Sequence, residues 1–312
     1  MRAVTIRDEE LLVCDHPDPE PSGGEVLVRV RAAGLNGADM MQRRGRYPAP
    51  PGAPPDIPGL ELAGEVAQLG PGPSRWALGD RVMAIVAGGG QAELCLVHER
   101  QLMAVPESLD WAHAGGLPEV FTTAHDALFT QAGLRMGEKL LVHGGAGGVG
   151  TAAIQLGRAA GARVTATVRA EDKRDAVAAL GAEVLPHEGW EEHGPWDLIL
   201  ELVGAPNLAR NLQALATNGR IATIGIGAGA KGELNLGLLM ARRGRIHGST
   251  LRARPLEEKA AATRLVERHV LPLITAGTIE VPLAATFGLE HATEAYDAFA
   301  AGGKLGKIVL EA

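Results

Sequence analysis

The chain has 312 residues, the length of about two domains, and 46% of them are hydrophobic, enough for sizeable buried cores. Its 37 acidic residues outnumber its 30 basic ones, and the net charge of −7 argues against a general nucleic-acid-binding or anionic-membrane-binding protein. Two cysteines, Cys14 and Cys95, are too few for a disulfide framework. The N-terminus lacks the apolar core of a signal peptide, so we expect a cytoplasmic protein.

The N-terminal third of the chain predicts a β-rich module. Residues 34–43 predict a turn into a short helix, and residues 47–58 carry six prolines, which is typical of a rigid loop. Glycine and proline clusters separate several short apolar or alternating runs, as expected for an all-β unit. These predicted strands lie at residues 3–6, 26–33, 59–70, 79–86 and 92–97.

After residue 106 the pattern changes to alternating strands and helices, which implies a parallel sheet covered on both faces. Helices are expected first at residues 111–116 and 122–132. Strand–helix units follow at 139–160, 163–180 and 197–215, with further strands at 221–224 and 245–251. A long helix at 255–276, a helix at 290–301 and a terminal strand at 307–310 complete the chain, and this last strand is expected to return to the first module.

The stretch of residues 139–156 organises the second module. A short apolar strand leads into Gly145, Gly147 and Gly150, spaced as G-x-G-x-x-G, and an alanine-rich helix follows. This order is the context that a dinucleotide-binding fingerprint requires, because the glycines permit a tight turn, approach of the backbone to a pyrophosphate and close helix packing. The free N–H groups at the helix start then meet the phosphates. The alternative is a glycine-rich turn without a ligand.

Several motifs, in their order and spacing, resemble the zinc-independent quinone oxidoreductases of the medium-chain dehydrogenase/reductase superfamily. The resemblance is closest to the tumour-suppressor-inducible quinone oxidoreductase branch, and it covers nearly the whole chain. The motifs are Gly34-Leu-Asn-Gly-Ala-Asp, Arg44-Gly-Arg-Tyr-Pro-Ala-Pro-Pro-Gly, Pro58-Gly-Leu-Glu-Leu-Ala-Gly-Glu-Val, Gly79-Asp-Arg-Val, Gly88-Gly-Gly-Gln-Ala-Glu, His143-Gly-Gly-Ala-Gly-Gly-Val-Gly and Gly306-Lys-Ile-Val-Leu.

This resemblance implies an α/β protein with two domains and usually a homodimer. Residues 1–117 and 268–312 are expected to form a GroES-like, β-rich substrate domain. Residues 118–267 are expected to form a Rossmann domain, a doubly wound parallel sheet that binds NADPH. The chemistry implied is NADPH-dependent hydride transfer to a quinone-type acceptor.

Zinc is not expected in this enzyme. Zinc-using relatives place a cysteine near the position of Asn36 and a histidine near Leu60, and their structural zinc lobe needs four closely spaced cysteines, which this sequence lacks. Without a Lewis acid the enzyme must polarise a carbonyl by hydrogen bonds, or use acceptors that need little polarisation. Quinones and conjugated enones are such acceptors.

The resemblance implies that Asn36 and Tyr47 are catalytic residues of the substrate cleft. The amide of Asn36 can bond a cofactor ribose or a substrate oxygen, and Tyr47 offers a phenol on the proline-rich loop. Each also has a plainer interpretation, Asn36 as a turn residue and Tyr47 as a loop side chain on an apolar surface. Asp39 is interpreted as a helix-start cap rather than an acid catalyst.

Arg169 follows the second predicted strand of the Rossmann domain, where NAD-selective folds place an acid for the ribose. With Lys173 it suits the 2′-phosphate of NADPH, although both residues also fit an ordinary solvated helix start. His143 is interpreted as a packing residue at a strand end, and Lys307 as a phosphate contact or a cap of the last strand. The cofactor-binding candidates are Asn36, Thr123, Gly147, Gly148, Val149, Arg169, Lys173, Gly204, Ile224, Gly225, Thr250, Leu251 and Lys307.

The sequence thus predicts an NADPH:quinone oxidoreductase that needs no metal. One alternative is a 2-alkenal or enoyl reductase. Another, from a different class, is an NADPH-binding protein without turnover, of the crystallin-like or RNA-binding kind, although the net charge of −7 weakens the RNA-binding version.

Overall fold

The computed structural model describes residues 1–312 and divides into two compact units. The first unit comprises Met1–Thr122, Leu251–Gly302 and Lys307–Ala312, and the second comprises Thr123–Thr250 and Gly303–Gly306. The sequence interpretation ended the Rossmann domain at residue 267. In the structure α8 (Leu256–His269) belongs to the first unit, because it packs against η1 (Glu99–Gln101) and β7 (Leu102–Ala104).

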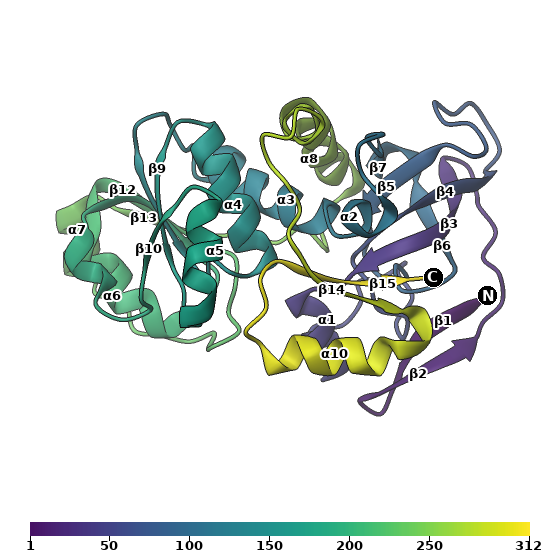
Figure 1. The fold of residues 1–312 in the computed structure, drawn as a ribbon, viewed down its shortest axis with the longest axis horizontal. Coiled ribbons are helices and arrows are strands. Elements are labelled where there is room, and N and C mark those ends of the chain that lie inside the picture. The colour runs from purple at the N-terminus through teal and green to yellow at the C-terminus, as the bar shows by residue number, and fades with distance from the viewer. The chain divides into compact units, whose positions relative to one another are not determined.

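The first unit is built on a seven-stranded sheet of order β14-β15-β3-β4-β5-β7, with β6 paired to β3 (Figure 1). Its strands are β3 (Glu25–Gly34), β4 (Glu61–Leu69), β5 (Arg81–Ile85), β6 (Leu94–His98), β7, β14 (Leu283–Gly288) and β15 (Lys307–Glu311). A separate antiparallel hairpin joins β1 (Arg2–Arg7) to β2 (Glu10–Asp15). The terminal strand β15 returns to this unit and pairs antiparallel with β3, as the sequence predicted.

Helices of the first unit are short, apart from α8 and α10. They are α1 (Gly37–Arg43), α2 (Trp111–Gly115), α8, α9 (Leu271–Thr275) and α10 (Ala292–Ala301), while α3 (Pro118–His125) spans the boundary to the second unit. One core cluster joins Val28 of β3 to Leu62 of β4. Another packs Tyr296 of α10 against Ile308 and Leu310 of β15. These apolar contacts hold β15, the strand that begins at Lys307, in place.

The second unit is a six-stranded, wholly parallel sheet of order β10-β9-β8-β11-β12-β13. Its strands are β8 (Lys139–His143), β9 (Arg163–Thr167), β10 (Glu183–Leu185), β11 (Trp196–Glu201), β12 (Leu215–Thr223) and β13 (Arg245–Gly248). The strand order reverses between β8 and β11, which makes this the topological switch point where such sheets bind ligands.

Helices cover both faces of this parallel sheet, as its buried apolar strands require (Figure 1). They are α4 (Gly148–Ala159), α5 (Arg174–Ala179), α6 (Leu208–Gln213) and α7 (Leu236–Arg242). Contacts tie α4 to β8 and β9, and α5 to β10, whereas α6 and α7 pack on β12. The doubly wound Rossmann sheet predicted from the sequence is therefore present.

The structure corrects three local predictions. The helix predicted over residues 255–276 is two helices, since α8 ends at His269 and α9 begins at Leu271, where Pro272 has no N–H to continue the ladder. Residues 126–131 of the predicted helix 122–132 are a π-helix. The strand predicted at 245–251 ends at Gly248. None of the helices combines the length and apolar character needed to span a membrane.

Candidate active site

The glycine-rich turn joins β8 to α4 in the close geometry that the fingerprint predicts. A Cβ at Gly150 would lie 2.3 Å from the carbonyl oxygen of Gly144, and one at Gly145 would lie 2.8 Å from Cβ of Ala166, so neither position tolerates a side chain. Gly147 is the N-cap of α4 and supplies no side-chain hydrogen bond. The first-turn N–H groups of a twelve-residue helix therefore have no side-chain cap, which fits the pyrophosphate of a dinucleotide.

The other cofactor candidates of the second unit lie after neighbouring parallel strands. Arg169 follows β9 and is exposed, whereas Lys173 pairs with Asp172 at 3.0 Å. Gly204 follows β11 with φ of 126°, and a Cβ there would lie 2.6 Å from the carbonyl oxygen of Gly229. Ile224 and Gly225 follow β12 and donate to the carbonyl oxygen of Glu201 at 3.0 and 3.1 Å. The carboxyl ends of three strands thus bring these residues, with Gly148 and Val149 of α4, to one edge of the sheet.

A buried polar network lies beneath these turns. His143, at the end of β8, bonds Thr167 through Nδ1 at 2.9 Å and Asn211 through Nε2 at 2.8 Å. Asn211 in turn donates to Oε2 of Glu201 at 2.7 Å. Burial lowers the pKa of His143, although the carboxylate of Glu201 opposes that shift. Trp190 packs edge-on against the imidazole, so His143 is a buried network member and not an exposed base.

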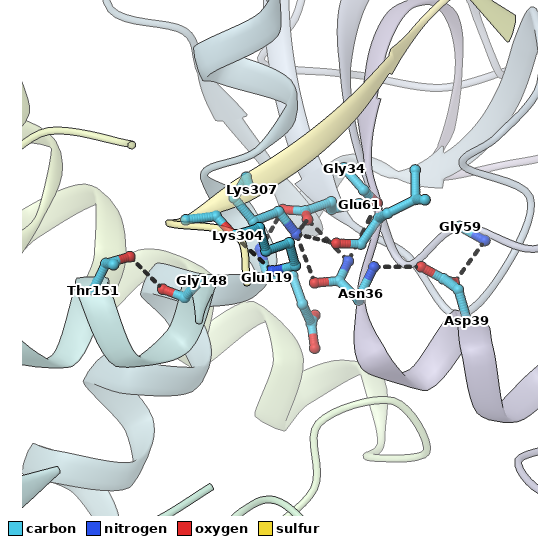
Figure 2. Close-up of polar contacts among 12 residues, drawn as sticks. Gly34, Asn36, Asp39, Gly59, Glu61, Glu119, Gly148, Thr151, Lys304 and Lys307 are labelled. Atoms are coloured by element: carbon cyan, nitrogen blue, oxygen red, sulfur yellow. Dashed lines mark hydrogen bonds and ion pairs between the residues drawn. The ribbon is translucent and has the colours of Figure 1, made fainter. Parts of the chain in front are cut away.

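In the first unit Asn36 lies at the start of α1, and Figure 2 shows its side chain directed at Glu61 and Lys307. The amide nitrogen donates to Oε1 of Glu61 at 2.9 Å and to the Gly34 carbonyl at 3.3 Å. Asp39 accepts the backbone N–H of Asn36 at 2.8 Å, which confirms its interpretation as a helix-start cap. The amide of Asn36 is therefore held in one orientation by buried partners.

Lys307 is buried and takes part in this same network rather than reaching solvent. Its ammonium donates to the Leu35 carbonyl and to Oδ1 of Asn36 at 2.7 Å each, and to Oε1 of Glu61 at 2.6 Å (Figure 2). The second oxygen of Glu61 accepts the N–H of Glu119 at 2.8 Å. All three ammonium hydrogens are thus used inside the first unit, so this geometry leaves Lys307 none to donate to a cofactor phosphate.

Tyr47 is half-buried on the proline-rich loop, and Arg252 holds it there. The guanidinium of Arg252 donates to the carbonyl oxygens of Tyr47 and Ala87 at 2.9 and 2.8 Å and to the side chain of Gln42 at 2.6 Å. Its carbon lies 5.0 Å from the centre of the Tyr47 ring. Desolvation raises the pKa of Tyr47, Arg252 lowers it and Glu119 raises it further. The phenol is accordingly a weak acid on a fixed loop.

The remaining candidates lie near the points where the chain passes from one unit to the other. Thr123 is half-buried in α3, and Thr250 is exposed after β13. The side chain of Leu251 is buried against Ile85 and Ala262 in the first unit, so it is not available for a cofactor contact. No group of three or more His, Cys, Asp or Glu side chains is arranged to hold a metal ion.

Sequence reasoning missed four residues of these networks, namely Glu61, Glu201, Asn211 and Arg252. The two glutamates carried a usable signal, because each interrupts an apolar strand where a charge is costly unless it has partners. Asn211 lies in a helix and Arg252 in a loop, and their partners are distant in sequence. For those two no local pattern marks the role.

Two family models match the chain in the order of its two units. Alcohol dehydrogenase GroES-like domain matches residues 22–131, and Zinc-binding dehydrogenase matches residues 148–268. The quinone oxidoreductase of Rattus norvegicus is 32% identical over 305 residues, covering 94% of this chain and 90% of the relative. That of Homo sapiens is 30% identical over 304 residues, with the same coverage.

Solved structures agree with this relationship. The Pseudomonas syringae quinone oxidoreductase aligns with a TM-score of 0.90 and 26% identity, over 100% of this chain and 99% of that one. A mycobacterial protein complexed with NADPH, Rv1454c, aligns with the same score and identity over 100% of both chains. The chain therefore belongs to the quinone oxidoreductases of the medium-chain dehydrogenase/reductase superfamily, and it is an oxidoreductase by that membership.

Proposed function

We propose that this protein is an NADPH-dependent reductase that transfers hydride to a quinone-type acceptor without a metal ion. The observation that carries the cofactor assignment is the glycine turn at the switch point, whose uncapped helix start and small residues fit a pyrophosphate. The NADPH complex of the mycobacterial relative supports a nicotinamide cofactor. The relationship to quinone oxidoreductases supports the acceptor class.

The second unit would hold the dinucleotide through Gly147, Gly148, Val149 and Gly204, with Arg169 at the 2′-phosphate. NADPH supplies the hydride when it is bound. The protein contributes mainly position, because bringing a flat acceptor to a fixed reactive carbon removes much of the entropic barrier. A quinone takes up hydride readily, and the reduced product can take its protons from solvent.

In the first unit Asn36 and Tyr47 would contact the cofactor or the acceptor. Both amide hydrogens of Asn36 are used by Glu61 and Gly34, but Oδ1 accepts from Lys307 and retains a second lone pair. Asn36 is therefore better suited to accept a hydrogen bond from a ribose hydroxyl than to polarise a substrate carbonyl. Tyr47, fixed by Arg252, would form a wall of the acceptor site.

We further propose a cytoplasmic homodimer that forms through β13. This strand is the outer edge of the six-stranded sheet, and an edge strand can pair with a copy of itself. The neighbouring helix α7 exposes Leu236 and Met240, two large apolar side chains. An exposed apolar pair beside a free sheet edge supports this face as the dimer contact.

A steady-state screen of NADPH and NADH oxidation against simple quinones, 2-alkenals and enoyl esters tests the proposal. Quinones should give the highest kcat/KM with NADPH, and activity should survive dialysis against a chelator, with no stoichiometric zinc by elemental analysis. Preference for 2-alkenals or enoyl esters would favour the other enzyme class. NADPH binding without turnover of any acceptor would identify a binding protein, and loss of activity with removal of one zinc per chain would refute the metal-free mechanism.

A further inference from the structure

Glu201, the last residue of β11, joins two turns of the proposed dinucleotide site. Its main-chain carbonyl accepts the N–H groups of Ile224 and Gly225, at 3.0 and 3.1 Å. Its side-chain Oε1 accepts those of Val203 and Gly204, at 2.6 and 2.8 Å. The turns that follow β11 and β12 are thus both anchored on one buried residue.

The other carboxylate oxygen of Glu201 begins a chain of hydrogen bonds with a defined direction. Oε2 can only accept, so the amide nitrogen of Asn211 donates to it at 2.7 Å, and the Asn211 oxygen must accept from Nε2 of His143 at 2.8 Å. Nε2 of His143 therefore carries a proton, and because burial lowers the pKa of His143 the neutral ring is favoured, in which Nδ1 accepts from the hydroxyl of Thr167 at 2.9 Å. Every polar atom along this chain has a partner.

This chain of bonds crosses the switch point of the sheet. Glu201 ends β11 and His143 ends β8, and these are the neighbouring strands at which the strand order reverses. Thr167 ends β9, directly before Val168 and Arg169. In a doubly wound fold one half of the sheet binds each mononucleotide of the cofactor. The glycine turn and Arg169 belong to the half of β8, β9 and β10, and the turns held by Glu201 belong to the other.

We propose that Glu201 is a positioning residue for the dinucleotide, which shapes the turns for the nicotinamide half and ties them through Asn211 and His143 to the half that binds the adenosine. This inference rests on the proposed use of NADPH. Glu201 is 3% exposed and carries no cation partner within 3.5 Å, because its nearest basic atom, Nε2 of His143, lies 4.0 Å away. Its carboxylate is held by N–H donors alone: the backbone of Val203 and Gly204 in the turn, and the side-chain amides of two asparagines, Asn207 and Asn211.

The test compares two ligands on the full chain by calorimetric titration: NADPH, and 2′,5′-ADP, which contains only the adenosine half. Glu201→Leu removes the acceptor for Val203 and Gly204 while keeping the side chain's size. NADPH binding should weaken by about tenfold or more, whereas 2′,5′-ADP binding should change by less than about twofold. Asp197→Leu is the matched control, because Asp197 accepts a backbone N–H, that of Lys139, at 2.8 Å at the opposite end of the same strand.

A purely structural role would weaken both ligands by the same factor, and that result would overturn the inference, as would unchanged NADPH binding in Glu201→Leu. If Glu201→Leu fails to fold, Glu201→Gln decides, since it keeps one oxygen for the turn and should weaken NADPH alone by about threefold or more. Equal effects of Glu201→Gln on the two ligands would count against the proposal. If wild-type protein binds neither 2′,5′-ADP nor NADPH, the proposed function fails and the inference fails with it.

The link across the switch point has its own variants. His143→Leu removes the donor to Asn211 and should also weaken NADPH more than 2′,5′-ADP. His143→Gln retains an N–H at a similar distance along the side chain and should restore at least half of the NADPH affinity that His143→Leu loses. Equal NADPH affinities in these two variants would show that only packing at residue 143 matters.

Discussion

The ammonium nitrogen of Lys307 lies 2.6 Å from Oε1 of Glu61, and the two side chains are only 3% and 0% exposed. The pair connects the last strand of the chain, β15, to the first residue of β4. Because Lys307 also donates to Asn36 and to the carbonyl of Leu35, the start of α1 is tied to the same two strands. A buried ion pair of this kind sets the orientation of the Asn36 amide in the candidate active site.

Removing one partner of a buried pair leaves the other charge uncompensated. Lys307→Met should therefore lower the free energy of unfolding by roughly 3–5 kcal/mol, measured by urea denaturation. The double variant Lys307→Met/Glu61→Gln should recover part of that loss, because no unpaired charge remains. Lys231→Met, at an exposed lysine, is the control. Wild-type stability in Lys307→Met would contradict the importance of the pair.

Asp39 should make the stability depend on pH in the direction opposite to most carboxylates. Desolvation raises its pKa from 3.8 to about 6, although N–H donors from Asn36 and Gly59 and the charge of Lys307 oppose the shift. The folded state then binds the proton more tightly than the unfolded state, so the contribution of Asp39 to stability falls as pH rises from about 4 to 6.

This effect is isolated by comparison with Asp39→Asn, which cannot ionise. We take the free energy of unfolding of Asp39→Asn minus that of wild type, so that the contributions of all other titrating groups cancel. This difference should be most positive above pH 6 and should decrease as the pH is lowered toward 4. The total change should be of the order of 3 kcal/mol for a shift of about two pKa units. A difference that stays constant between these pH values would mean that Asp39 has an ordinary pKa.

The sequence predicted those parts of the fold whose signals are local. The glycine spacing after residues 140–142 located the dinucleotide turn, and apolar runs located most strands. The second strand of the N-terminal hairpin escaped detection, because its two-residue turn places Asp8 and Glu9 at positive φ, where glycine or asparagine is the usual signal. Helix α7 was also missed, since Leu236 and Met240 are exposed and give it no clear apolar face.

The candidate site was less predictable because its contacts are distant in sequence. Lys307 and Glu61 are 246 residues apart, so no local pattern could show that the lysine is a partner of a buried carboxylate rather than a phosphate contact. The same holds for Arg252 and Gln42, which are 210 residues apart. By contrast, Glu61 and Glu201 were open to prediction as charges within apolar strands.

Tyr47 should shape the acceptor site without supplying an essential proton. Its pKa is raised above the ordinary value of 10.0, so the phenol is a poor proton donor to a neutral reaction. Tyr47→Phe keeps the ring over Arg252 and should retain most of the quinone turnover, whereas Tyr47→Ala should raise KM by opening the wall. If kcat collapses in Tyr47→Phe while NADPH affinity is intact, the hydroxyl takes part in chemistry.

The proposed dimer can be disrupted at one backbone donor of β13. Ser249, just beyond the strand, donates its N–H to the Thr223 carbonyl of β12 at 3.3 Å. Successive N–H groups along a strand point in opposite directions. The N–H of Ile246, three residues earlier, therefore points away from β12, to the open edge of the sheet. Ile246→Pro should therefore weaken dimerisation without breaking a bond to β12.

Met240→Asp should also weaken the dimer, because Met240 is 76% exposed on the adjacent helix α7. Leu78→Asp, at an exposed leucine of the first unit, is the control and should leave the dimer intact. Light scattering at micromolar concentration measures the oligomeric state, and a monomeric wild type would refute the proposal.

We expect cofactor choice to depend on the turn after β9. Lys173 pairs with Asp172 at 3.0 Å and Arg174 with Glu171 at 3.4 Å, so two of the three nearby cations already have acidic partners. Arg169 is exposed at the strand end, where an NAD-selective fold places an acid. It is therefore the principal candidate for the 2′-phosphate of NADPH, which carries about two negative charges where NADH has a neutral hydroxyl.

Arg169→Asp should invert this preference. A charge-assisted hydrogen bond contributes roughly 1.5–3 kcal/mol, so its loss should weaken NADPH binding by about one to two orders of magnitude, and the new carboxylate adds repulsion. NADH binding should hold or improve, because aspartate can accept from the ribose hydroxyls. Titration of both cofactors measures the ratio, and the wild-type preference should shrink as salt is raised. Arg163→Asp, at the opposite end of β9, makes the same charge change away from the site. Equal binding of the two cofactors to wild type, or an unchanged ratio in Arg169→Asp, would show that Arg169 is an ordinary surface charge.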